Sequence, residues 1–263
     1  MTGRVVIVTG ASSGIGEAAV RAFGARGDSV VLVARRRERL QALAASVPDS
    51  LPITADVTRP DDRQRVVEQT LARYGRVDVL VNNAGVGLYD WIDQQSEEAI
   101  YQEVATNLVA PLLLTRAVIR VMLQAGKGVI INVGSIASRV GTPAMSIYNA
   151  TKFGLHGFTE ALRREVGPQG IAVCGIYPGG VAGTEFTRHR RVNPMVTTPS
   201  WLRLRVDRVA QEIVALADRP RAERIMPSIF RPVVAVNAVW PAVVDAAVMR
   251  RVHRPRGREE AGK

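Results

Sequence analysis

The chain opens with the stretch Gly3-Arg4-Val5-Val6-Ile7-Val8-Thr9-Gly10-Ala11-Ser12-Ser13-Gly14-Ile15-Gly16, and this stretch decides the fold. Its first half is a β-branched apolar run, which is typical of a fully buried strand. Its second half is a glycine-rich turn, and a helical pattern follows over residues 17–26. Glycines let the backbone approach a pyrophosphate, and a helix N-terminus presents unpaired N–H groups to it. The arrangement predicts a dinucleotide site, although the spacing G-x-x-x-G-x-G departs from the commoner G-x-G-x-x-G.

Further apolar runs alternate with helical patterns, at residues 29–34, 51–57, 77–81, 128–133 and 171–176. Continuous apolar strands separated by helices predict a parallel sheet that is covered on both faces. With a helix at 205–217 and a strand at 224–227, we predict a single-domain, Rossmann-like, doubly wound α/β sheet of about seven strands. Ligands of such sheets bind beyond the carboxyl ends of the strands. Those ends carry Gly10, Ala34, Asp56, Asn82, Ser135 and Pro178.

Composition narrows the class of protein. The 263 residues fit one large α/β domain, and the single cysteine, Cys174, forms no internal disulfide and gives no metal cluster. The net charge of +11 could attract nucleic acid or anionic lipid, but no nucleic-acid motif accompanies it, so we interpret it as surface arginine. The apolar run over residues 5–8 is too short for a signal peptide, which predicts a cytoplasmic protein.

Three arginines follow the second predicted strand. The position where NAD-binding proteins carry an acid for the ribose hydroxyls holds Ala34, and Arg35, Arg36 and Arg37 come next. We expect Arg35 to bind a 2′-phosphate, with the Ser13 hydroxyl beside it, while Arg36 and Arg37 only start a solvated helix. The sequence therefore favours NADP(H) over NAD(H).

A tyrosine and a lysine are placed for proton transfer. Tyr148 and Lys152 lie four residues apart, on one face of a predicted helix. An ammonium beside a phenol favours the phenolate, so we expect Lys152 to lower the pKa of Tyr148 towards neutrality. Such a pair can exchange a proton with an alcohol oxygen, although the same spacing is also common on exposed helix faces.

Together these motifs resemble the short-chain dehydrogenase/reductase family of the typical single-domain kind. The resemblance covers residues 3–186 and rests on Thr9–Gly16, Asn82-Asn83-Ala84-Gly85, Asn107, Ser135, Tyr148 with Lys152, and Pro178-Gly179. It implies that Tyr148 is the general acid and base, that Ser135 holds the substrate oxygen, that Lys152 binds the nicotinamide ribose, and that Asn107 holds a water. Ser138 is a weaker candidate for the serine role. The expected cofactor residues are Gly10, Ser12, Ser13, Gly14, Ile15, Gly16, Arg35, Asp56, Val57, Asn83, Ala84, Gly85, Tyr148, Lys152, Pro178, Gly179, Val181 and Thr184.

The chain departs from the family pattern at one position. The family usually carries a threonine five residues after the proline of Pro178-Gly179, where this chain has Gly183, followed by Thr184. Either the loop bulges by one residue, or the contact with the carboxamide is made differently.

The remaining segments concern the substrate. Residues 185–204 show no regular hydrophobic period. In the family that the chain resembles, this position carries a lid over the substrate. An apolar pocket is expected from Leu88, Tyr89, Trp91, Ile136, Val140, Met145, Met195 and Trp201, which predicts a hydrophobic ketone or secondary alcohol.

The last part of the chain forms a separate apolar extension. We divide the chain into a catalytic domain (1–228) and an extension (229–263) with a basic tail. The extension either walls the pocket, packs on another subunit, or anchors the protein at a membrane surface, and the first two are favoured. A homodimer or homotetramer is expected from the resemblance.

Three functions remain open. The leading prediction is an NADP(H)-dependent reductase of a carbonyl. An NAD-dependent alcohol dehydrogenase and a non-catalytic dinucleotide sensor are the alternatives. A sensor would not need the combination of Asn107, Ser135, Tyr148 and Lys152.

Overall fold

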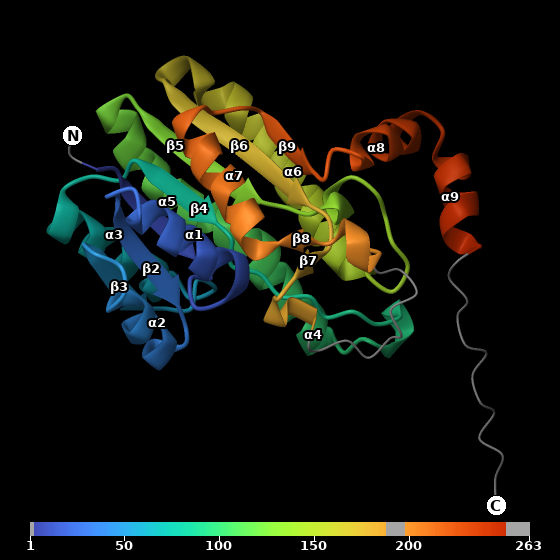
Figure 1. Ribbon diagram of the computed structural model, residues 1–263, viewed down its shortest axis with the longest axis horizontal. Coiled ribbons are helices and arrows are strands. Elements are labelled where there is room, and N and C mark those ends of the chain that lie inside the picture. The colour runs from blue at the N-terminus through green and yellow to red at the C-terminus, as the bar shows by residue number, and fades with distance from the viewer. Residues whose placement is uncertain (1–2, 188–197, 251–263) are drawn as a thin grey trace, which may run out of the picture.

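A computed structural model describes residues 3–187 and 198–250 of the chain. Its centre is a seven-stranded parallel sheet in the order β3-β2-β1-β4-β5-β6-β9 (Figure 1). The strands are β1 (Val5–Thr9), β2 (Ser29–Ala34), β3 (Ser50–Thr54), β4 (Val79–Asn82), β5 (Gly128–Val133), β6 (Ile171–Pro178) and β9 (Glu223–Met226). The order reverses direction at β1, and ligands of such folds bind at this point. The predicted fold class is confirmed.

Helices cover both faces of the sheet, and successive residues of β1 serve opposite layers. Val6 and Val8 pack with α1 (Gly14–Gly24), α2 (Arg37–Ala44) and α7 (Val206–Asp218). Val5 and Ile7 pack with α3 (Pro60–Tyr74), α5 (Ala110–Ala125) and α6 (Ser146–Val166). Cys174 is fully buried in the first layer, so packing accounts for it. The two layers hold the sheet rigid beneath the loops at its carboxyl edge.

The long helix before β5 is interrupted beside Asn107. α4 (Glu97–Val104) runs into a π-helical turn (Ala105–Val109), and α5 continues from there with Pro111 in its first turn. A proline cannot donate to the helical ladder and clashes with the carbonyl four residues earlier. The predicted interruption therefore takes the form of a widened turn, and Asn107 sits inside it.

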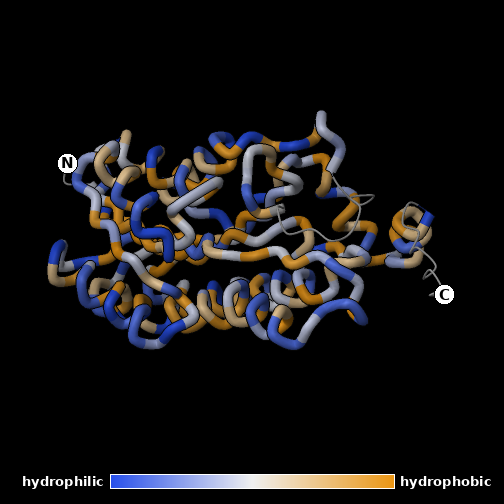
Figure 2. The backbone as a smooth tube through the Cα atoms, turned by 90° about the horizontal axis from the view of Figure 1, so that it is seen from below, coloured by the Kyte–Doolittle hydropathy of each residue, from blue (hydrophilic) through white to orange (hydrophobic). Residues whose placement is uncertain are grey.

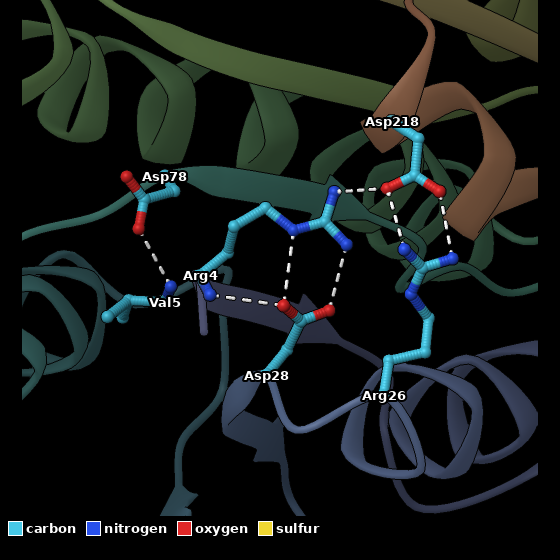
Figure 3. A network of polar contacts seen from close by, with 6 residues as sticks. All are labelled: Arg4, Val5, Arg26, Asp28, Asp78 and Asp218. Atoms are coloured by element: carbon cyan, nitrogen blue, oxygen red, sulfur yellow. Dashed lines mark hydrogen bonds and ion pairs between the residues drawn. The ribbon is translucent and has the colours of Figure 1, made fainter. Parts of the chain in front are cut away.

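The amino ends of the strands are joined by a network of charges (Figure 3). Arg4 donates to both carboxylate oxygens of Asp28, at 2.8 to 3.2 Å, and to Asp218 at 2.9 Å. Asp218 also pairs with Arg26 at 2.8 Å, and Asp78 accepts from the backbone N–H of Val5 at 2.8 Å. This network ties β1 to the helices on one face.

Short elements and the C-terminal extension complete the chain. The 3₁₀ turns are Ile92–Gln94, Ile136–Ser138, Gly167–Gln169, Glu185–Thr187 and Ser200–Leu202, and β7 (Val181–Ala182) pairs with β8 (Leu204–Arg205).

α8 (Phe230–Val239) packs on the end of the sheet, whereas α9 (Pro241–Met249) stands away from the body (Figure 1). Figure 2 shows that hydrophobic residues continue into this outlying part. The middle of the expected lid, with His189 and Met195, lies outside the described residues.

By length and composition, the helical stretch Glu97–Ala125 could cross a membrane, and the bent pair of α8 and α9 passes the same test. α5 buries Leu114, Val118 and Met122 against the sheet, as the core helix of a globular domain does. The pair of α8 and α9 is largely exposed.

Candidate active site

A cleft of about 700 Å³ lies at the carboxyl ends of the strands. This volume lies in the usual range for small-molecule sites. Most of the residues expected from the sequence line it: Gly10, Ser12, Ser13, Gly14, Ile15, Arg35, Asp56, Val57, Asn83, Ala84, Gly85, Ser135, Tyr148, Lys152, Pro178, Gly179, Val181 and Thr184. Gly16 and Asn107 are instead part of the packing behind its wall.

The residues expected to transfer a proton lie at one end of this cleft. Tyr148 and Lys152 are each only 5% exposed, although both belong to α6 near its start. The Lys152 ammonium donates to the backbone carbonyl of Val133 at 3.0 Å and lies 5.7 Å from the centre of the Tyr148 ring. The Tyr148 hydroxyl shares side-chain hydrogen bonds with Ser135 and Tyr89. Sequence reasoning did not foresee Tyr89 as a partner of the phenol.

The pKa values at this end differ from the expectation. Burial raises the pKa of Tyr148 well above its ordinary value, and the hydrogen bonds from Ser135 and Tyr89 offset only part of that rise. Burial lowers the pKa of Lys152 to about 8. The prediction of a lowered Tyr148 pKa is therefore wrong for the protein by itself, because burial and the nearby Glu103 charge raise that pKa more than the two hydrogen bonds lower it.

A buried glutamate next to this group was missed by sequence reasoning. Glu103 is fully buried on α4, one helical turn before Asn107. One carboxyl oxygen accepts from the backbone N–H of Leu88 at 3.2 Å, and the other has no hydrogen-bond partner among the described residues. Burial raises the pKa of Glu103 to about 7, against the lowering effects of the Leu88 N–H and of the Lys152 charge. No motif marks it, because its role depends on burial.

Asn107 and Ser138 act on the backbone around the site. The Asn107 side chain donates to the carbonyl of Val86 and accepts from its N–H, both at 2.8 Å, and so pins the loop after β4. Ser138 is fully buried and accepts from the N–H of Ser135 at 3.2 Å. Ser135 thus faces the cleft while Ser138 supports it from behind.

The glycine-rich turn is held tightly against β4. Gly10 has a left-handed φ of 67°, and a Cβ at Gly16 would lie 2.2 Å from the Gly10 carbonyl oxygen, so neither position admits a side chain. The Asn83 amide donates to the Thr9 carbonyl at 2.9 Å, and the Thr9 hydroxyl accepts from the backbone N–H groups of Asn83 and Ala84. The turn is therefore a rigid cradle in the protein by itself, shaped to let a phosphate approach the backbone.

At the other end of the cleft, Arg36 lines the wall together with Arg35, and it is Arg36 that contacts the glycine-rich turn. The Arg36 guanidinium donates to the hydroxyls of Ser12 at 2.8 Å and Ser13 at 2.6 Å. Helix α2 begins one residue later, at Arg37, so the expectation that Arg36 only starts this helix is wrong. Arg35 is more exposed and lies 4.0 Å from Asp56. The extended backbone of Arg36 turns its side chain towards the glycine-rich turn.

Asp56 is held by its own loop. Burial would raise the pKa of its carboxyl, but hydrogen bonds from the backbone N–H and hydroxyl of Thr58, at 3.0 and 2.7 Å, and the nearby Arg35 charge lower it below its usual value. Asp56 is thus a fixed carboxylate at the edge of the cleft.

The loop after β6 shows how the shifted threonine is accommodated. Gly183 has a left-handed φ of 77°, which favours glycine. The resulting turn brings Thr184 to the cleft wall, where a Cβ on Gly14 would lie 3.4 Å from its methyl group. Thr184 thus lines the cleft, and its contact with the carboxamide stays a prediction.

Comparison with known proteins agrees with the motifs and the fold. Residues 4–194 match the family described as short chain dehydrogenase. The chain belongs to this family. It is an NAD(P)-dependent oxidoreductase, and the fold of this family binds a nicotinamide dinucleotide.

Several relatives resemble this dehydrogenase over most of its length. 11-beta-hydroxysteroid dehydrogenase A of Sesamum indicum is 35% identical over 93% of this chain and 74% of the relative. 3-oxoacyl-[acyl-carrier-protein] reductase of Synechocystis sp. is 32% identical over 88% of this chain and 95% of the relative. A solved short-chain dehydrogenase from Sphingobium yanoikuyae, in complex with NADPH, has a TM-score of 0.77 and 33% identity, covering 97% of this chain and 99% of that one.

The substrate end of the dehydrogenase differs in part from the expectation. Leu88, Tyr89, Ile136 and Met145 line the cleft. Trp91, Val140 and Trp201 are not among its lining residues, and Trp201 is 76% exposed. Val140 packs with Tyr177 and α8 instead.

Phe186 was not expected at the site. Its ring lies 5.6 Å from that of Tyr148 and 6.3 Å from that of Tyr89, centre to centre, and it lines the cleft. Phe186 follows the left-handed turn at Gly183, and the linear pattern gave no sign that it would reach the site.

Proposed function

We propose that this short-chain dehydrogenase interconverts an apolar ketone and a secondary alcohol with NADP(H), using Tyr148 as general acid and base. The observation that carries the proposal is the cluster of Tyr148, Ser135 and Lys152 at the end of a cleft whose far corner presents Arg36. When bound, the cofactor supplies or accepts the hydride.

The chain's own residues supply the proton chemistry. Tyr148 donates its proton to the substrate oxygen during reduction, and Ser135 holds that oxygen by a hydrogen bond. Lys152 fixes the ribose of the cofactor and, as a cation, stabilises the phenolate that remains. Asn107 keeps the Val86 loop in position beside them.

The corner around Arg36 supports NADP(H) over NAD(H). Ser12, Ser13, Arg35 and Arg36 line the cleft there, and Ala34 puts no carboxylate next to the ribose. Guanidinium and hydroxyl groups are suitable donors to a phosphate. The Sphingobium yanoikuyae structure contains NADPH, which agrees with this preference.

Binding of both cofactors to matched variants tests the proposal. In Arg36→Ala, we expect the Kd for NADPH to rise about 10- to 100-fold, while the Kd for NADH changes less than about twofold. Arg37→Ala, next to it in sequence but exposed, is the control and should change neither. If NADH binds more tightly than NADPH, and neither Arg36→Ala nor Arg35→Ala weakens NADPH, the NAD-dependent alternative is correct.

Turnover separates the enzyme from a dinucleotide sensor. We expect steady oxidation of NADPH with bulky apolar ketones, at a higher kcat/KM than with small charged ketones, because Leu88, Ile136 and Met145 line the substrate end. Tight NADPH binding without turnover of any ketone or alcohol in a broad screen would favour the sensor.

The expected oligomer has a candidate interface. Apolar side chains are exposed on the α4, π-helical and α5 stretch and on α6, namely Tyr101, Val109, Leu113, Leu123 and Phe153. Their burial between two copies would stabilise a dimer. A monomer by analytical ultracentrifugation at micromolar concentration would contradict this.

We further propose that the extension contacts an anionic membrane surface. Of its described side chains, Val239, Trp240, Val243 and Met249 are each at least 60% exposed, and α8 and α9 contribute nothing to the cleft lining. Helix α9 is exposed around most of its circumference, which suits immersion in lipid better than a one-sided protein contact. Arg250, Arg251, Arg254, Arg256 and Arg258 follow in sequence and would attract anionic headgroups.

Vesicle sedimentation tests this contact. The full chain should pellet with anionic vesicles and less with neutral ones, and Trp240→Ser with Val243→Ser should reduce pelleting. Unchanged pelleting in that double variant would contradict it, and the expectation of a purely cytoplasmic protein would stand.

A further inference from the structure

A carboxylate of the chain itself occupies the donors of the Arg36 corner. Glu185, in the 3₁₀ turn after β7, accepts from Arg36 at 2.6 Å and from Arg39 at 3.1 Å. The same Arg36 guanidinium donates to Ser12 and Ser13. Glu185 joins this corner from nearly 150 residues further along the chain, and it also lines the cleft.

These donors are the ones that the proposed function assigns to a 2′-phosphate. The phosphate is the whole chemical difference between NADP(H) and NAD(H), and it is an anion that seeks the same N–H groups as a carboxylate. Two anions at one guanidinium repel each other, so the phosphate can bind Arg36 fully only when Glu185 moves away. NAD(H), which lacks the phosphate, imposes no such requirement.

The residue after Glu185 lies against the catalytic tyrosine. The Phe186 ring makes edge contacts with Tyr148 and Tyr89, and a Cβ on Gly87 would meet it at 2.6 Å. Adjacent residues of one short turn therefore lie at both functional ends of the cleft. Because Glu185 and Phe186 are adjacent in one short turn, a backbone shift of that turn which carries Glu185 away from Arg36 also moves Phe186.

We propose that Glu185 is a specificity-determining residue, an internal competitor that the 2′-phosphate displaces from Arg36, and that this displacement draws Phe186 away from Tyr148. Glu185 thereby weakens binding of the phosphorylated cofactor, and at the same time makes opening of the catalytic end depend on the phosphate. The inference rests on the proposed use of NADP(H).

Fragments of the cofactor test the competition without any turnover. Adenosine 2′,5′-bisphosphate carries the phosphate, and 5′-AMP lacks it, so calorimetric titration of both isolates its contribution. In Glu185→Gln, we expect the bisphosphate to bind about fivefold more tightly and 5′-AMP to change less than about twofold. Glu38→Gln removes an equal charge from the exposed start of α2 and should leave both affinities within about twofold.

A double variant shows whether the effect passes through Arg36. In the Arg36→Ala background, Glu185→Gln should bring no gain for the bisphosphate, because the shared donor is gone. An equal gain for both fragments, a similar gain in Glu38→Gln, or a gain that persists without Arg36 would each overturn the competition.

Hydrogen exchange tests the coupling to Phe186. The bisphosphate should speed amide exchange in the peptide that contains residues 184–187, and 5′-AMP should not. Exchange that stays unchanged or slows with bisphosphate bound would overturn the coupling. If the bisphosphate and NADPH fail to bind the wild-type chain, the proposed function fails as well; if they bind and Glu185→Gln has no effect, only the role of Glu185 fails.

Discussion

The two edges of the parallel sheet use charge in opposite ways. At the amino edge, Arg4 and Asp28 satisfy each other with several hydrogen bonds, and Asp218 links Arg4 to Arg26 (Figure 3). At the carboxyl edge, the described part of the chain leaves one oxygen of Glu103 without a partner, and Arg36 is held by a carboxylate on a short turn.

The charges at the amino edge therefore contribute to stability, and those at the carboxyl edge to the proposed function. Paired charges at the amino edge fasten elements that do not need to move. Burial at the carboxyl edge shifts the pKa values of Tyr148, Lys152 and Glu103, and shifted pKa values are common at functional sites. Substitutions at the two edges should therefore change different measurements.

The largest effect is expected at the carboxyl edge. Tyr148→Phe should lower kcat by about 10³-fold, because the general acid is lost, and should leave the fold intact. Tyr177→Phe is the matched control, since Tyr177 is equally buried but bonds to His156 at 2.7 Å outside the cleft. Steady-state kinetics check this, and full turnover in Tyr148→Phe would remove the proposed mechanism.

The next effect belongs to the amino edge. Asp28→Asn should lower the free energy of unfolding by about 3 kcal/mol, because it leaves the Arg4 guanidinium without its buried partner. Asp218→Asn, at a more exposed position, should cost less than about 1 kcal/mol. Urea denaturation measures both, and kcat should stay unchanged in each. A loss of activity in folded Asp28→Asn would show that the two edges are coupled.

A smaller effect is expected for the buried acid of the carboxyl edge. Glu103 has a pKa of about 7 in the folded protein, against 4.5 for an ordinary glutamate. The folded state thus binds more protons between these values, so its stability should fall as the pH rises from about 4.5 to about 7. Glu103→Gln should remove this slope and be more stable at pH 8 by on the order of 2 kcal/mol.

Denaturation curves across pH 4.5 to 8 check this expectation. Glu97→Gln, at the exposed start of the same helix, is the control and should keep the slope of the parent protein. Identical slopes in the parent and in Glu103→Gln would mean that this carboxyl is ionised throughout, and the two edges would then be more alike than the geometry indicates.

Local patterns predicted what depends on local chemistry. The continuous apolar runs predicted the parallel sheet, and the glycines of the first turn predicted where a ligand's phosphates approach. Tyr148 and Lys152 could be singled out from their spacing on one predicted helix, whereas Ser135 was expected from the family resemblance. The sequence could not show that Arg36 is the arginine that contacts the glycine-rich turn. That contact depends on where the helix starts and on the positions of Ser12 and Ser13.

By itself, then, the sequence determined the doubly wound sheet and the family, since periodicity and motif spacing act within single elements, and it singled out the residues proposed for proton transfer. Tertiary structure decided the burial of Glu103, the reversal of the expected pKa of Tyr148, and the meeting of Glu185 with Arg36. These are contacts between segments distant in the chain, and desolvation and pairing are properties of what surrounds a side chain.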